Sequence, residues 1–537
     1  MTPLDQALTQ WRLVLGDDAV RSTDDELAQH NTATYSTPAR LAAVLSPEST
    51  QQVSEIMRIA SAHGVPVYPW SRGRNWGYGS RTPVVDGSVG IDLGPMRRIL
   101  DIDEEMGTAT VEPGVSFWDL VTELRERGSR WFVSVPGTSA DASVIGNLLE
   151  RGWGFGPYSD RFAHSTGMEV VLADGTIVQT GLRRWADARA GTLHRWGSGP
   201  AMDGLFTQSN FGIVTRLTVF LAPIPNFHST FLYRVDGEDR LPGLIDALRW
   251  LRMQGILRTN VTIGNVYRQI MIRERMPRQS VADPAELPAD RLTELKHKHG
   301  LGDFNGIGAL YCVSAEQLEA EERIVHHALD SHVDAMVFLD PHAQRGRLTM
   351  RDTVLAKTGY DIDALMDHYY EHTRMLGDVT GRGLHGAFWR KPEGEYDFAD
   401  LDGHGVGFIW IDPVVPFRGS DVRDAAQLAT RIQREYGFEP NFAFNAVTER
   451  SMMMTCALVY DIDAADLDAR AHACSRALAD AMVAAGFPIG RLTTRTMDYA
   501  GTGDPGAIEL HRRIADAINP GGILAPGRYD PRSSRPS

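Results

Sequence analysis

Short apolar runs alternate with helix-like segments through the first part of the chain. Residues 41–45 form an apolar run as long as a buried strand, and apolar residues then recur at helical spacing across residues 53–60. Ser46-Pro47 resembles a helix N-cap followed by a proline at the first helical position, and Gly64 ends the pattern. This alternation predicts packed layers of sheet and helix. Further strands are expected at residues 65–69, 108–112, 168–172 and 214–221.

The character of the chain changes after Pro223. Longer helical patterns occupy residues 315–329 and 461–485. Glycine and proline become frequent again toward the end, in the segment 519–528. These shifts predict a middle region that differs in organisation from the two ends of the chain.

Composition narrows the class of protein. The 537 residues carry a formal charge of -15, and a nucleic-acid-binding protein would need a basic face instead. No window approaches the roughly 18 apolar residues of a membrane-spanning helix, and the first residues lack the basic start and apolar run of a signal peptide. Three scattered cysteines suit neither a disulfide framework nor a structural zinc site. We therefore expect a soluble cytoplasmic protein that binds neither nucleic acid nor membrane.

A glycine-rich segment follows the strand expected at residues 65–69. Glycines at positions 73, 77 and 79 allow a sharp turn, and the N–H groups of such a turn form an anion-binding concavity. Arg72 and Arg74 add donors suited to a pyrophosphate. The segment is not G-x-G-x-x-G, so a Rossmann interpretation is weak, and it could equally be a tight surface turn with solvated arginines. The candidate ligands are Ser71, Arg72, Gly73, Arg74, Asn75 and Trp76.

Two further segments have the composition of backbone wrapped around a flat ring. Residues 136–160 combine many glycines with aromatic residues, and residues 208–215 form a turn that leads into a strand. Glycine density alone would also fit a loop-rich packing corner, so each segment is a weak signal by itself. Their candidate ligands are Pro136, Gly137, Thr138, Ser143, Gly146, Asn147, Gly156, Ile213 and Val214.

The order and spacing of these segments resemble the vanillyl-alcohol oxidase and p-cresol methylhydroxylase family of flavoproteins. The resemblance covers most of residues 40–222 and 497–530, including the closing segment Ile-Leu-Ala-Pro-Gly-Arg at 523–528. It implies an α+β fold with a split FAD-binding domain of the vanillyl-alcohol oxidase type and an inserted α/β substrate-capping domain. The FAD-binding domain would comprise residues 1–222 and 488–537, and the capping domain residues 223–487.

The resemblance also implies roles for particular side chains. Arg528 occupies the position of a basic residue near the flavin N1–C2=O edge, although it could also be a surface arginine close to the C-terminus. Glu150 stands where the family usually has an aspartate near flavin N5, and Tyr78 matches a tyrosine that contacts the substrate phenolate. The family's Tyr-Arg pair falls on Gly490-Arg491, which keeps the cation and loses the tyrosine. Loss of that side chain predicts a larger pocket and a larger or differently substituted aromatic substrate.

The resemblance leaves covalent attachment of the flavin open. His404 lies one position from the histidine that the best local match expects, so it is a candidate attachment residue, and dissociable FAD is an equal alternative. Residues 368–372 match the H-x-x-E-H pattern of some zinc peptidases. No third ligand motif follows, so a polar helix face is the favoured interpretation there and at His326, His327 and His332. We expect no metal site.

The predicted function is removal of hydride by FAD from the benzylic-type carbon of a phenolic or related aromatic substrate. Glu150, Tyr78 and Arg491 are the candidate catalytic residues. Either O₂ or an electron carrier would reoxidise the flavin, and family members commonly form homodimers. The alternative is a flavin-binding protein with a non-redox role, as an isomerase or a binding module, because function depends on the site and not on the fold.

Overall fold

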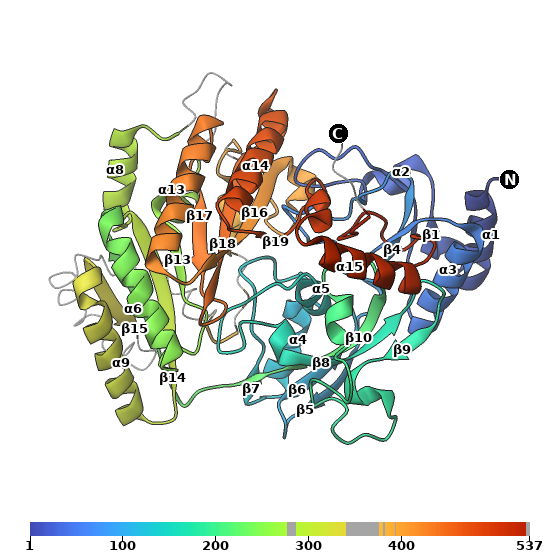
Figure 1. The fold of residues 1–537 in the computed structure, drawn as a ribbon, viewed down its shortest axis with the longest axis horizontal. Helices are drawn as coiled ribbons and strands as arrows, with labels where there is room; N and C mark the ends of the chain where they lie inside the picture. Colours follow the sequence, from blue (N-terminus) through green and yellow to red (C-terminus); the bar gives the residue numbers. More distant parts are fainter. Residues whose placement is uncertain (277–285, 340–374, 378, 380–381, 393, 533–537) are drawn as a thin grey trace.

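The computed structural model describes residues 1–276, 286–339, 375–377, 379, 382–392 and 394–532 (Figure 1). Within this part of the chain, the strands form four sheets. Three lie in the N-terminal part, up to residue 223, and the largest is built from residues 227–491. No helix in the described part is both long and apolar enough to cross a membrane.

The first sheet is a four-stranded layer with the order β1-β2-β4-β3. Strand β4 pairs in parallel with β2 and with β3. Helices α1 and α3 contact each other beside this sheet, and their apolar faces share a buried core with its strands. The bounds are β1 (Val20–Arg21), β2 (Leu41–Leu45), β3 (Val67–Trp70), β4 (Ser88–Asp92), α1 (Pro3–Leu15), α2 (Asp24–Ala28) and α3 (Thr50–His63).

Helix α3 begins three residues later than the sequence pattern predicts. Its N-cap is Ser49, whose side chain accepts a hydrogen bond from the backbone N–H of Gln52. The hydroxyl of Ser46, the expected cap, instead accepts from the guanidinium of Arg21. The predicted start was wrong because two serines, Ser46 and Ser49, could each cap the helix. The contact with Arg21 occupies Ser46, and Ser49 is the cap.

The second sheet is antiparallel and has the order β5-β6-β10-β8-β9. Helices α4 and α5 share a buried core with it, and a small two-stranded sheet of β7 and β11 adjoins this region. The bounds are β5 (Ile99–Asp103), β6 (Thr108–Val111), β7 (Trp131–Phe132), β8 (Ser165–Val171), β9 (Ile177–Gln179), β10 (Ile213–Phe220), β11 (Ala222–Pro223), α4 (Phe117–Glu126) and α5 (Val144–Leu149).

The largest sheet has eight strands in the order β15-β12-β14-β13-β17-β18-β16-β19. Its pairings are antiparallel. The bounds are β12 (Phe227–Val235), β13 (Thr262–Asn265), β14 (Phe304–Cys312), β15 (Ala335–Leu339), β16 (Val406–Pro416), β17 (Phe442–Asn445), β18 (Ser451–Asp461) and β19 (Ile489–Arg491).

Helices α6, α9, α13 and α14 share the apolar core of this sheet and lie along one side of it in Figure 1. Helix α9 has the predicted bounds, whereas the first part of the helix expected at 461–485 belongs to β18 and the loop that follows. Two shorter helices, α7 and α8, come between β13 and β14 in the sequence. The bounds are α6 (Leu241–Met253), α7 (Val266–Arg273), α8 (Ala289–Lys298), α9 (Ala315–Leu329), α13 (Gly419–Glu435) and α14 (Leu467–Ala484).

The C-terminal segment returns to the first sheet. After helix α15 (Pro505–Ile518), Leu524 forms a parallel bridge with Val67 of β3. The apolar face of α15 packs in the core of the second sheet, through Ile514, Ala515 and Ile518. Strand β19 lies just past the expected domain boundary at residue 487 and pairs with β16 of the eight-stranded sheet. The C-terminal segment therefore lies against the edge of the first sheet, at β3.

Candidate active site

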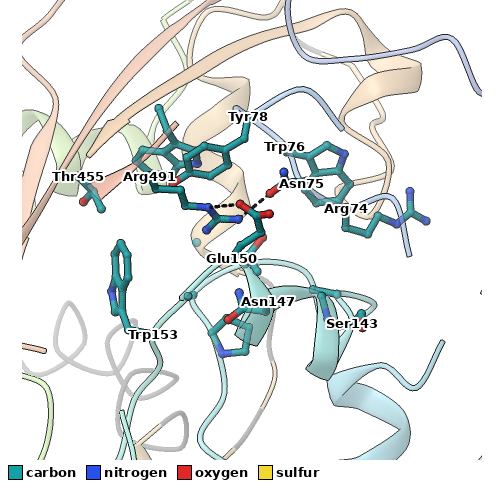
Figure 2. A pocket seen from close by; sticks show the side chains of 18 of the residues that line it. Arg74, Asn75, Trp76, Tyr78, Ser143, Asn147, Glu150, Trp153, Thr455 and Arg491 are labelled. Atoms are coloured by element: carbon teal, nitrogen blue, oxygen red, sulfur yellow. Dashed lines mark hydrogen bonds and ion pairs between the residues drawn. The ribbon is translucent and has the colours of Figure 1, made fainter. Parts of the chain in front are cut away.

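A cavity of about 400 Å³ lies between the N-terminal sheets and the eight-stranded sheet (Figure 2). This volume is in the range of small-molecule sites, roughly 300–1,000 Å³. The lining comes from residues 68–80, 136–153 and 206–214, from strands of the large sheet, and from the C-terminal segment 524–528. Segments far apart in the sequence therefore meet around one space.

The glycine-rich segment forms part of the wall directly after β3. Residues Ser71, Arg72, Gly73, Arg74, Asn75 and Trp76 all line the cavity. In the described part of the chain, none of the backbone N–H groups from Arg72 to Trp76 has a hydrogen-bond acceptor. Buried N–H groups are nearly always paired in folded proteins. This run is therefore a cradle for a group rich in acceptors.

The two arginines of this segment are paired within the protein. Asp141 accepts hydrogen bonds from Arg72 and from Nε of Arg74, the second at 3.1 Å. The guanidinium of Arg74 also lies 5.5 Å from the centre of the Trp76 ring. Asp141 therefore fixes both side chains at the cavity wall and neutralises part of their charge.

Helix α5 brings the second group of predicted residues to the cavity. Ser143 caps this helix by accepting from the backbone N–H of Gly146 at 2.9 Å. A Cβ atom on Gly146 would lie 2.3 Å from Oγ of Ser71, so a side chain here would require Ser71 or the helix to shift. Asn147 accepts a hydrogen bond from Arg161. The lining residues from this region and from β10 are Pro136, Gly137, Thr138, Ser143, Gly146, Asn147, Ile213 and Val214.

Glu150 is the centre of a buried cluster of charges at the end of α5. Its carboxylate forms an ion pair with Arg528 and accepts a hydrogen bond from the Tyr529 hydroxyl at 3.2 Å. Nε of Arg491 lies 3.7 Å from Oε2 of this carboxylate (Figure 2). Burial alone would raise the pKa of Glu150, but the two guanidinium groups outweigh it and hold the pKa below its usual range. Glu150 is thus an ionised group at neutral pH and a weak base.

Tyr78 and Arg491 face each other at the cavity wall. The guanidinium carbon of Arg491 lies 3.8 Å from the centre of the Tyr78 ring, and Nη2 donates to Oδ1 of Asn75 at 2.6 Å. The Tyr78 hydroxyl donates a hydrogen bond to the carboxylate of Asp412, on β16. A cation from a distant part of the chain thereby lies on the face of the Tyr78 ring, whose hydroxyl is held by Asp412.

Some predicted residues lie away from the cavity. Gly156 and His404 are not among its lining residues. Nε2 of His404 accepts from the backbone N–H of Asp397, and its ring lies 5.5 Å from that of Tyr396. The residues that β16 presents to the cavity are Phe408 and Trp410. The structure therefore does not bring His404 together with the other predicted residues.

The expectation that Gly490 enlarges the pocket is not supported by its position. A Cβ atom there would lie 2.8 Å from the side chains of both Met453 and Val414, and Gly490 does not line the cavity. Of the histidines considered for a metal, His326 and His327 lie on α9 and His332 just beyond it. The H-x-x-E-H pattern at 368–372 lies outside the described residues.

Asp412 and Tyr529 were not among the residues predicted from the sequence. Asp412 stands alone in the otherwise apolar strand 406–416, and a lone carboxylate in such a run was a usable signal, because an unpaired buried charge is costly. Tyr529 carried no comparable signal, since it lies one residue beyond the closing segment. The aromatic lining residues Trp153, Phe155 and Trp410 were also not singled out.

The cavity fits a long, flat and anionic cofactor. The unpaired N–H groups of residues 72–76 suit a pyrophosphate. The glycines at 146 and 152 have no side chains that would project into the cavity. Arg528, which is almost fully buried, supplies a fixed cation at one end. These features match the chemical groups of FAD.

Comparison with known proteins agrees with this fit. A family model described as an FAD binding domain matches residues 41–181. The chain is 38% identical over 534 residues to the 1'-carboxy-chondrochloren decarboxylase of Chondromyces crocatus, covering 99% of this chain and 98% of that protein. It is 30% identical over 529 residues to the flavoprotein subunit of the hydroxylating 4-cresol dehydrogenase of Pseudomonas putida, covering 97% and 95% of the two chains.

A solved structure shows the same fold over the whole chain. The crystal structure of p-cresol methylhydroxylase with substrate bound superposes with a TM-score of 0.87 at 29% identity, covering 98% of this chain and 97% of that one. The predicted α+β fold and the FAD cofactor are thereby confirmed. The chain belongs to the vanillyl-alcohol oxidase and p-cresol methylhydroxylase family of FAD-binding oxidoreductases.

Proposed function

We propose that this protein is an FAD-dependent oxidase or dehydrogenase acting on a phenolic or related aromatic substrate, from whose benzylic-type carbon hydride is removed. The observation that carries the proposal is the pairing of Tyr78 with Arg491 at the wall of the cavity. The tyrosine hydroxyl and the guanidinium that lies on its ring both suit the oxygen of a phenol, and Trp153 and Trp410 supply aromatic surface in the same space. Bound FAD supplies the hydride acceptor.

The lining residues divide into two groups in this proposal. Residues of the parts 1–222 and 488–537 hold FAD, and the part 223–487 covers the substrate. The backbone of residues 72–76 binds the pyrophosphate, while Ser143, Gly146 and Asn147 position the wall beside it. The remaining contacts to FAD come from Ser71, Pro136, Gly137, Thr138, Ile213, Val214 and Arg528.

The charge cluster defines a cationic end of the site. Arg528 is held by Glu150 and by the hydroxyl of Tyr68, at 2.9 Å from Nη1. A fixed cation stabilises negative charge on a reduced flavin, and a preorganised one does so without reorganisation. Glu150 keeps Arg528 and Arg491 in place as an ionised partner, so we assign it a positioning role and not that of a base.

The test is an absorption titration of the purified holoprotein without oxygen. A panel of 4-alkylphenols is added, and we expect at least one member to bleach the flavin spectrum. The matching 4-alkylanisoles, in which the hydroxyl is methylated, should not. Arg491→Met should lower the rate of bleaching by at least about tenfold, roughly 1.4 kcal/mol, through loss of the cation beside the phenol oxygen. Binding of phenols with no bleaching would instead favour the non-redox alternative.

Two further measurements define the cofactor and the acceptor. Acid precipitation separates covalent flavin, which stays in the pellet, from dissociable FAD, which remains in solution. Because His404 lies away from the cavity, we expect the colour in the supernatant. Admitting air after bleaching then distinguishes an oxidase, which recovers its colour at once, from a dehydrogenase that needs an electron carrier.

Decarboxylation is a second candidate activity. The relative from Chondromyces crocatus is named a decarboxylase, and it matches this chain over nearly its full length. A carboxylate substrate needs a cation, and Arg268 of α7 lines the cavity beside Trp410, with its guanidinium carbon 5.0 Å from the ring centre. Incubation with 4-hydroxyphenylalkanoic acids and measurement of released CO₂ tests this activity. Release that depends on Arg268, compared with an Arg268→Met variant, would support it.

A further inference from the structure

A carboxylate is buried in the strand that closes the cavity. Successive side chains of a strand point to opposite faces, so Phe408, Trp410 and Asp412 of β16 share one face. Phe408 and Trp410 line the cavity, while Ile409 and Ile411 belong to the apolar core behind the sheet. Asp412 is fully buried directly beyond the cavity wall.

The partner of this carboxylate is the Tyr78 hydroxyl. Tyr78 donates to Oδ2 of Asp412, and Oδ1 has no hydrogen-bond partner among the described residues. Strands β16 and β19 pair so that Asp412 lies opposite Arg491. Residues opposite each other in an antiparallel pair project from the same face. The Arg491 guanidinium lies on the Tyr78 ring, so Tyr78 connects the cavity with Asp412.

Charged and titratable groups reach Asp412 from four other segments of the chain. They are Tyr78 from the glycine-rich segment, Arg491 from β19, Arg268 from α7 and Cys456 from β18. Burial raises the pKa of Asp412 to about 7, although the hydrogen bond from Tyr78 and the two arginines oppose the rise. Burial and the neighbouring carboxylate raise the pKa of Tyr78 well above its usual value. Of this pair, Asp412 is therefore the group that takes up a proton near neutral pH.

On the basis of the proposed function, we propose that Asp412 is a positioning residue that accepts, through the hydroxyl of Tyr78, the proton of a phenolic substrate. The substrate O–H bond breaks as its proton passes to Oη of Tyr78. The original Tyr78 proton passes at the same time to Oδ2 of Asp412. Tyr78 ends as it began, Asp412 becomes a neutral acid, and its negative charge is transferred to the substrate oxygen beside Arg491.

In this proposal the enzyme recognises the substrate partly through its phenolic hydroxyl, which must give up its proton. Asp412 must be ionised before the substrate binds, so activity should rise with pH through an acidic limb set by this carboxylate. With no proton acceptor, the enzyme would depend on phenolate already present in solution. The limb would then move to the higher pKa of the free phenol.

The experiment compares pH profiles of kcat/KM for holoprotein variants, with the 4-alkylphenol that bleaches the wild type best. Binding of 4-nitrophenol, followed by difference absorption, reports the ionisation state of a bound phenol directly. Asp412→Asn keeps the size and can still accept from Tyr78, but it takes no proton. We expect it to lose the limb near pH 7 and to lose at least tenfold in kcat/KM just above it, where the wild type has an ionised Asp412 and the free phenol is still protonated. Asp412→Glu should restore part of both.

Two further variants separate a relay from a structural contact. Tyr78→Phe should lose the same limb, and adding Asp412→Asn to it should cause no further change. Asp402→Asn is the matched control, because Asp402 is also a buried carboxylate, with a pKa raised by burial to about 6, and it binds Ser80 of the same segment at 2.8 Å. It should leave the limb where the wild type has it.

The outcomes are distinguishable. A wild type that is bleached by phenols, with a limb that survives Asp412→Asn, refutes the role of Asp412 alone. A uniform loss at every pH that Asp412→Glu does not restore refutes it too, since that pattern indicates a structural defect. Failure of every phenol to bleach the wild-type flavin refutes the proposed function, and the assignment with it.

Discussion

At the scale of single residues, burial of Asp412 couples the stability of the protein to pH. Its pKa rises from 3.8 to about 7 in the folded protein, so the folded state holds the proton more tightly than the unfolded chain. The stabilising effect of this protonation is fully present below pH 3.8 and is lost as pH rises through 7. Asp412→Asn should therefore gain stability relative to wild type between pH 5 and 8, by at most about 4 kcal/mol.

The measurement is thermal unfolding of both holoproteins across that range. The difference in Tm, variant minus wild type, should increase steadily with pH and level off above the pKa of Asp412. A difference that does not change with pH would contradict the assignment of a raised pKa. Asp402→Asn should behave in the same direction with a smaller rise, because burial raises the pKa of that carboxylate less.

Gly146 is the residue whose missing side chain matters most for the cofactor. Gly146→Ala would place Cβ 2.3 Å from Oγ of Ser71 and push α5 away from the glycine-rich segment. We expect FAD affinity to fall by about tenfold or more, equivalent to 1.4 kcal/mol. Fluorescence of released FAD during dilution measures the change.

A second substitution and a control isolate the steric cause. Ser71→Ala in the Gly146→Ala chain removes the clashing oxygen and should recover part of the affinity. Gly204→Ala is the control, because a Cβ atom on this exposed glycine meets nothing within 4 Å. An unchanged affinity in Gly146→Ala would show that the two segments adjust without effect on the site.

At the scale of elements, helix α5 depends on one serine for its start. The Ser143 hydroxyl accepts from the N–H of Gly146 and donates to the carbonyl of Pro113 at 2.6 Å. Ser143→Ala should cost about 1 kcal/mol of stability. Because α5 also positions Gly146 and Glu150, FAD affinity should fall with it, as calorimetric titration of the apoprotein would show.

The N-cap of α3 provides the comparison. Ser49→Ala removes an equivalent cap, at 3.2 Å from the N–H of Gln52, from a helix that does not border the cavity. It should lower Tm by a similar amount and leave FAD affinity unchanged. Ser143→Thr, which retains the capping oxygen, should restore FAD binding. Equal effects of both alanine variants on FAD affinity would remove the specific role of α5.

At the scale of the whole molecule, Asn519 ties the C-terminal segment to the N-terminal sheets. Its fully buried amide donates to the carbonyl oxygens of Asn210 at 3.2 Å and Leu524 at 3.0 Å. Asn519→Ala leaves both carbonyls without this partner and should cost about 2–3 kcal/mol. Flavin release on heating should shift down together with global unfolding, since Arg528 lies on the same segment.

Parallel records of flavin fluorescence and circular dichroism during heating test this coupling. Asn226→Ala is the matched control, because Asn226 makes a single long contact at the surface, 3.5 Å to the carbonyl of Val313. It should change neither transition. Release of flavin well before the unfolding of Asn519→Ala would show that the C-terminal segment detaches on its own.

Features that depend on residues close together in the sequence were predicted correctly, and features that depend on distant residues were not. Strand β2 and helix α9 have the predicted bounds, because their apolar periodicity and their flanking residues are local. The start of α3 was misplaced because a contact with Arg21 competes for Ser46. None of the strands of the eight-stranded sheet was predicted, since short apolar runs such as residues 442–445 carry no period that separates strand from helix.

Through its resemblance to a known family, the sequence by itself determined the family and the FAD cofactor, and it identified the local segments that line one side of the cavity, because glycines and arginines at fixed spacing mark turns that bind an anion. Only the tertiary structure placed Asp412 behind Tyr78, paired Glu150 with Arg528 and left His404 outside the cavity. These relations join residues up to 378 positions apart. Strand register and burial decide these relations. The residues adjacent in sequence determine neither which distant side chains a residue contacts nor its pKa.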